Sequence, residues 1–109
     1  MRGRPKVGEL RQRVTIETPV DIADGAGGFT RSFTPLAQVW AKIEPASAME
    51  QFAEQRLEQS RTLVVTIRWR ADVASQMRFD HRGRKLLIRG AIDPDETRRF
   101  VKCACEEIT

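Results

Sequence analysis

The chain has 109 residues, of which 40% are hydrophobic and 31% charged, and its formal net charge is +4. This length favours one domain with a single core, and the composition is ordinary for a soluble globular protein. No apolar run is long enough to span a bilayer, and the N-terminus lacks the apolar stretch of a signal peptide, so we expect a cytoplasmic protein without membrane contact.

The basic residues are concentrated in two places. The first thirteen residues hold five basic residues against one glutamate, and a predicted hairpin around Gly83 holds five against one aspartate. Neither patch has interleaved aromatic residues or a helix for a DNA groove, which disfavours base-specific reading and leaves non-specific phosphate contact open. The candidate basic contact residues are Arg2, Arg4 and Lys6, in a mobile N-terminal arm over residues 1–8, and Arg82, Arg84 and Lys85 in the hairpin.

The first strand is predicted from residue 10 onward. Leu10, Val14 and Ile16 share one parity and alternate with polar residues, which is typical of a half-buried strand. Pro19 is expected to end its hydrogen-bond ladder. Residues 21–28, DIADGAGG, tolerate positive φ and therefore predict a turn or a flexible loop.

Two strands should return from that loop, a short one over residues 29–33 and a longer one over residues 36–44 that Pro45 closes. In the longer strand the inward residues are Val39, Ala41 and Ile43. This register turns Trp40 to the opposite face, where it is either covered by the next helix or contacts another chain. The sequence leaves both alternatives open.

Residues 46–61 form the segment whose apolar residues recur with a helical period. Ser47 and Glu50 form a capping box that predicts a helix start. Glu50, Glu54 and Glu58 lie on one face, and like charges four residues apart slightly destabilise an isolated helix. The acidic row is thus either a solvated face or has a role outside the helix.

The second half of the chain reads as strands. Residues 62–70 predict a central strand whose alternation turns Arg68 and Arg70 away from the core, and these two join Trp40 as candidate interface residues. Residues 77–81 and 85–92 flank Arg82-Gly83 as a hairpin. In the closing strand over residues 98–108, the inward set is open between Phe100 with Ala104 and Val101 with Cys103 and Cys105. The expected core comprises Val14, Ile16, Val39, Ile43, Leu63, Val65, Ile67, Phe79, Leu86 and Ile88.

These elements predict a mainly β fold, a small antiparallel barrel or sandwich with one helical insertion at about residues 47–59. The two cysteines, Cys103 and Cys105, are expected to be reduced and buried, and with the single His81 they lack the spacing of a zinc site. No nucleophile elbow, phosphate-binding loop or dinucleotide fingerprint is present. We therefore expect an interaction protein and not an enzyme, with no catalytic residue, no metal and no cofactor.

The order of short motifs resembles that of the head closure (head-tail joining) proteins of long-tailed bacteriophages. The resemblance covers residues 8–107, and no single motif is specific. The chain departs from the commoner pattern of the family in its Arg-rich N-terminal arm and in the ending RFVKCACEE. The matching stretches are GELRQRVTIE (8–17), Gly27-Gly28, VWAKIEP (39–45), TIRWR (66–70), MRF (77–79), RGRKLLI (82–88), IDP (92–94) and Cys105-Glu106.

The resemblance implies a single head-tail connector domain over residues 1–109, assembled in the bacterial cytoplasm as a ring of six or twelve copies in the virion. Its partners would be the portal or adaptor above, a tail terminator or tail-tube protein below, and packaged double-stranded DNA through non-specific contact. Residues 46–60 would be the channel-facing element, with Glu50, Glu54 and Glu58 toward the DNA. A prophage or gene transfer particle fits equally, and the alternative is a small nucleic-acid-binding module that uses the basic patches.

Overall fold

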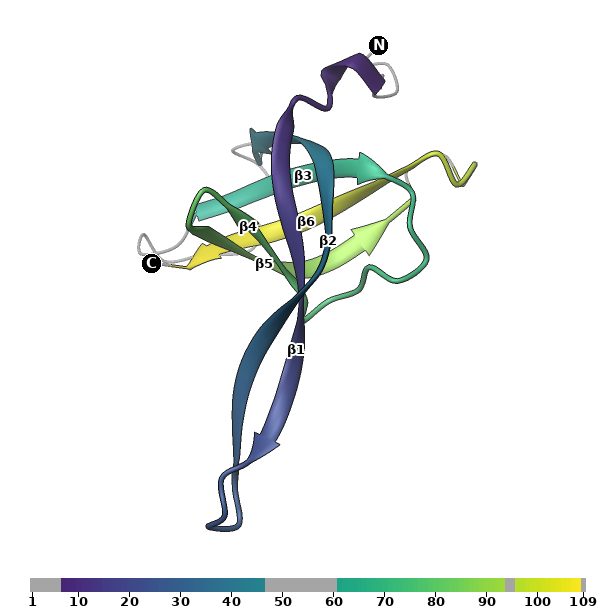
Figure 1. Cartoon of the computed structure of the whole chain (residues 1–109). Coiled ribbons are helices and arrows are strands. Elements are labelled where there is room, and N and C mark those ends of the chain that lie inside the picture. Colours follow the sequence, from purple (N-terminus) through teal and green to yellow (C-terminus); the bar gives the residue numbers. More distant parts are fainter. Residues whose placement is uncertain (1–6, 47–60, 94–95, 109) are drawn as a thin grey trace.

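The computed structural model describes residues 7–46, 61–93 and 96–108. Within these residues the strands pair antiparallel and close into a barrel in the order β1-β2-β3-β6-β5-β4 (Figure 1). The mainly β antiparallel barrel is therefore confirmed, while the helix expected at 47–59 lies outside the described residues. The elements are the 3-10 turn η1 (Val7–Glu9) and the strands β1 (Gln12–Ala23), β2 (Phe29–Pro45), β3 (Arg61–Arg68), β4 (Arg78–His81), β5 (Arg84–Ile92) and β6 (Phe100–Ile108).

Alternating residues of all six strands fill the barrel. Of the expected core, Val39 and Ile43 are partly buried and pack against the cluster, and the other eight residues are buried in it. On β6, Val101, Cys103 and Cys105 join the core, which settles the register that the sequence left open. Each of these residues lies opposite an inward residue of β3, and paired residues share one face of a sheet.

The first hairpin is longer than predicted. β1 continues through Pro19 to Ala23, and β2 is a single strand of 17 residues in place of two. β4 pairs with β1 only over Thr15 to Glu17, so Pro19 lies where β1 has β2 as its one strand neighbour. A missing N–H is tolerated on such an edge. The prediction that Pro19 ends the strand was wrong for this reason.

A bulge marks the point where the hairpin leaves the barrel. Ile16 pairs with Ala37 but Glu17 pairs with Pro35, so Leu36 is the extra residue. Beyond it, residues 18–23 and 29–34 form a two-stranded extension that we call the projecting ribbon (Figure 1). The shape is accordingly elongated, with extents of 54 × 30 × 26 Å.

The tip of the ribbon is an ordered turn. Asp24 Oδ1 accepts hydrogen bonds from the backbone N–H of Ala26 (2.8 Å) and of Gly28 (3.1 Å). Gly25 and Gly27 have φ of 81° and 89°, values that glycine adopts without a Cβ clash. The loop expected over residues 21–28 is thus reduced to the turn that follows Ala23.

One further boundary differs from the sequence prediction, and the hairpin turn expected at Arg82-Gly83 is present. β3 ends at Arg68 rather than at residue 70, and the Trp69 N–H bonds to the Arg99 carbonyl oxygen at 3.0 Å. The β4–β5 turn has positive φ at both Arg82 (56°) and Gly83 (88°), which fits a two-residue hairpin turn whose twist matches the strands. In the described part of the chain, no helix has the length and apolarity to cross a bilayer.

Candidate functional site

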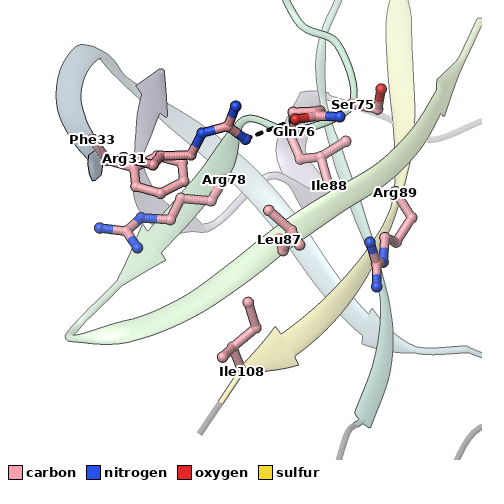
Figure 2. Close-up of a pocket in the computed structure, with 9 residues that line it drawn as sticks. All are labelled: Arg31, Phe33, Ser75, Gln76, Arg78, Leu87, Ile88, Arg89 and Ile108. Atoms are coloured by element: carbon pink, nitrogen blue, oxygen red, sulfur yellow. Dashed lines mark hydrogen bonds between the residues drawn. The ribbon is translucent and has the colours of Figure 1, made fainter. Parts of the chain in front are cut away.

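A groove of about 490 Å³ lies where the projecting ribbon meets the barrel (Figure 2). Its walls come from β2, from the loop that precedes β4, and from the outer face of β4, β5 and β6. The floor is apolar, because Leu87 and Ile108 reach it from the barrel and Phe33 from the ribbon. The remaining lining residues are Arg31, Ser75, Gln76, Arg78, Ile88 and Arg89.

Side-chain contacts fix the ribbon wall of the groove. Arg31 donates to the Asp21 carboxylate at 2.8 and 3.1 Å and to Gln76 Oε1 at 2.8 Å. The hydrogen bonds from Arg31 lower the pKa of Asp21. The guanidinium of Arg78 lies 3.8 Å from the centre of the Phe33 ring, a cation–π contact between the barrel and the ribbon.

The basic hairpin that the sequence singles out is largely neutralised. Arg84 forms two hydrogen bonds of 2.9 Å with Glu107, and Lys85 lies 3.2 Å from Asp80. Within the described residues Arg82 makes no ion pair. The other two cations of this hairpin are also paired, Arg78 with Glu17 and Arg89 with Glu106.

In the pairs that flank the groove, the carboxylate is the more buried partner. The Arg89 side chain is 50% exposed whereas that of Glu106 is 15% exposed, and the Arg78 and Glu17 pair follows the same order. The groove therefore presents guanidinium donors at its surface, although a more buried carboxylate neutralises each of these charges. Sequence reasoning missed this because Glu17 and Glu106 lie on β1 and β6, far along the chain from the hairpin.

A second surface surrounds Trp40 on the outer face of the barrel. Trp40 is 50% exposed, and the Arg13 guanidinium lies 4.7 Å from its ring centre. Ala41 pairs with Ile67, which places Trp40 and the exposed Arg68 at neighbouring outward positions. Arg70 lies beyond the end of β3 and is bound to Asp72 at 2.9 and 3.0 Å, so the structure does not bring it into this surface.

The two cysteines and the single histidine, which could perform thiol or acid–base chemistry, are buried. Burial raises the pKa of Cys103 to about 12 and raises that of Cys105 further, which keeps both thiols protonated at neutral pH. The buried His81 ring places Nε2 3.2 Å from Gln12 Oε1. Among the described residues no group of three or more His, Cys, Asp or Glu side chains is arranged to hold a metal ion.

The acidic row and the basic residues of the N-terminal arm lie outside the described residues. These are Glu50, Glu54 and Glu58 in the one set and Arg2, Arg4 and Lys6 in the other.

Residues 5–108 match the family model described as phage head completion protein. The chain belongs to the phage head completion protein family. The resemblance found in the order of its motifs is therefore confirmed.

Two solved structures share the fold of this head completion protein. One is a protein of Shigella flexneri 2a known from its solution structure, with a TM-score of 0.72 and 26% identity, covering 94% of this chain and 96% of that one. The other belongs to the virion of a native gene transfer agent particle, with a TM-score of 0.72 and 23% identity, covering 96% and 98%. No curated protein matches the chain significantly. The family identifies a structural component of phage-like virions.

Proposed function

We propose that this head completion protein forms a ring at the head-tail interface, where it closes the DNA channel after packaging and provides the platform for tail attachment. The observation that carries the proposal is the family match over residues 5–108. The ring would hold six or twelve copies, with the portal or adaptor above and a tail terminator or tail-tube protein below. Assembly would take place in the bacterial cytoplasm.

The outward surfaces fit repeated contacts between identical copies. A cyclic ring needs two different patches on each subunit, one of which meets the other patch of the next copy. Trp40 with Arg13 and Arg68 provides one exposed aromatic and basic surface and the groove at the ribbon base provides another, and each would receive a different patch of a neighbouring subunit or partner. The single domain expected from the sequence would then be the repeating unit of the ring.

The competing nucleic-acid-binding module has less support than the sequence alone gave it. A cation that is already paired with a carboxylate has less charge to offer a phosphate than an unpaired one. Arg84 and Lys85 are paired with carboxylates, which leaves Arg82 in the described part of that patch. Of the two basic patches that the sequence singled out, a DNA-binding surface would use Arg82 and the N-terminal arm.

Electron microscopy of purified particles tests the proposed location. Particles that carry an affinity label on this chain should show a ring density between head and tail, with the label on it. Particles from cells that lack the chain should have filled or leaking heads without tails. Heads with normal tails in the absence of the chain, or label found elsewhere on the particle, would contradict the proposal.

For the acidic row we propose a channel-facing position, in which Glu50, Glu54 and Glu58 repel the phosphates of passing DNA. The repulsion is screened over about 8 Å at physiological ionic strength, so it acts only if the row lines or closes the channel. Replacing all three with lysine should leave DNA retained but slow its ejection, and replacing them with glutamine should give a smaller delay. If retention and ejection are both unchanged, the row is a solvated face, and if no rings form, it belongs to a subunit contact.

A further inference from the structure

We propose that the tip of the projecting ribbon of one copy docks into the groove at the ribbon base of a second copy. The inference rests on the proposed ring and assigns one of its subunit contacts. Two features of the structure carry it, an apolar and acidic tip on the ribbon and an apolar groove with guanidinium groups at its rim.

The ribbon tip exposes large apolar side chains that do not pack against the barrel. Phe29 is 72% exposed and Ile22 is 55% exposed, and both lie within two residues of the Asp24 turn. Ala23 pairs with Phe29 and Ile22 pairs with Thr30, so the two side chains lie on opposite faces of the ribbon, and the tip presents an apolar group on each face. Asp21 is paired with Arg31, so within the described residues Asp24, which accepts only backbone N–H hydrogen bonds, gives the tip its acidic character.

The groove has the complementary character. Leu87 and the half-exposed Ile108 form an apolar floor, while Arg78 and Arg89 present their guanidinium groups at the rim (Figure 2). Because the partner carboxylates of these arginines are the more buried members of each pair, an acidic segment meets donors first. Complementary charge of this kind selects a partner and its orientation.

The ribbon tip of the same copy cannot reach the groove. Phe33 lies in the groove wall and Phe29 lies four residues further along the same strand, roughly 13 Å away at the usual rise of a strand. The register of the ribbon is continuous from Thr18 to Ala23, so the tip cannot fold back onto its own base. Tip and groove are different patches of one chain, and such a heterologous contact closes into a ring when the rotation allows it.

Cysteine cross-linking of the full-length chain tests the contact. The double variant F29C/I108C, treated with a short bismaleimide in solution and in purified particles, should give a ladder of covalent oligomers larger than dimers. Each single variant should stop at dimers, and an equimolar mixture of the two should give a new mixed dimer. The native Cys103 and Cys105 are buried and leave the wild-type chain as the unreactive control.

A second variant tests the same contact without a cross-linker, in case the reagent cannot bridge the two cysteines. F29S should weaken self-association by roughly tenfold or more, the expected effect of losing a buried aromatic anchor. The matched control I92S changes another strongly exposed apolar residue, 64% exposed, that lies outside both ribbon and groove, and it should have no effect.

The outcomes separate this inference from the proposed function. A ring visible in particles whose F29C/I108C copies cross-link no more than the single variants would overturn the docking contact and leave the proposed function standing. If the chain forms the ladder but is absent from the head-tail interface, the docking contact stands and the proposed function is overturned. If F29S assembles normally while R89Q abolishes retention of the chain on double-stranded DNA, the groove binds phosphate and the docking contact is overturned.

Discussion

Arg31 on the projecting ribbon is bound to Gln76 in the loop before β4 by a hydrogen bond of 2.8 Å between Nη1 and Oε1. Gln76 has φ of 78°, unusual for a residue other than glycine, and its own N–H bonds to the Ile88 carbonyl oxygen at 3.1 Å. The loop is thereby attached to β5 and the ribbon to the loop. This contact holds the ribbon against the barrel at the groove.

Shortening Gln76 should release the ribbon. Gln76→Asn keeps a side chain that tolerates the left-handed backbone but cannot reach Arg31, so we expect faster hydrogen exchange of ribbon amides with little change in global stability. Gln76→Glu, which keeps the reach and adds an ion pair, is the control and should slow the exchange. Equal exchange in all three chains would show that the ribbon is held by other contacts.

The sequence predicted the barrel well because inward and outward residues alternate along most strands. Val65 and Ile67 are fully buried as expected, since a period of two fixes the face of each residue once the strand is identified. Pro19 misled the prediction because its effect depends on whether the strand has one neighbour or two. That is a property of the sheet and not of the local sequence.

The candidate site was harder to predict than the fold. The basic character of the hairpin is plain in the sequence, but its neutralisation by Glu17 and Glu106 follows from strand order. The strand order places β4 beside β1 and β5 beside β6, and no local sequence pattern predicts either pairing. Trp40, in contrast, was correctly expected on the outer face because it lies between two inward residues.

Truncation of Ile67 should strongly destabilise the barrel. The side chain is fully buried in the core cluster, so Ile67→Ala removes apolar contacts and leaves a cavity, at a cost of about 2–5 kcal/mol in the free energy of unfolding. Urea denaturation followed by tryptophan fluorescence measures it. Arg68→Ala, one residue away and exposed, should change the midpoint little. An unchanged midpoint for the Ile67 variant would contradict the register of β3.

The two thiols should be inaccessible in the folded protein. Burial raises the pKa of Cys103 to about 12, so at pH 8 neither the thiolate nor a path for a reagent is available. Ellman's reagent should react only at the rate of unfolding, and should then report both cysteines in urea. Immediate reaction of one thiol under native conditions would show that β6 opens locally at that position.

His81 should make the folded state less stable in mildly acidic solution. Its burial, followed by the charges of Arg84 and Arg82, lowers its pKa below the ordinary 6.5, while Asp80 acts in the opposite direction. The unfolded chain then binds a proton more readily than the folded one, so stability is full above pH 6.5 and falls as the pH drops below it. His81→Gln should flatten this part of a stability profile measured between pH 5 and 8. The lowered pKa values of Asp21 and Asp72 contribute stability that is present above their ordinary pKa of 3.8 and is lost as the pH falls below it, so these groups do not shape the profile between pH 5 and 8.

Charge reversal at Arg68 should separate folding from assembly. Arg68 is exposed beside Trp40, so Arg68→Glu disturbs no core contact, and the monomer should melt as the wild type does. If this surface meets an acidic patch on the next copy or on the tail, the reversal places like charges together and should reduce the fraction of tailed particles. Arg82→Glu makes the same charge change at the β4–β5 turn and should leave tails attached. Tailed, infective or transducing particles at normal yield with Arg68→Glu would remove this surface from the interface, and a defect confined to Arg82→Glu would favour the basic patch as the working surface.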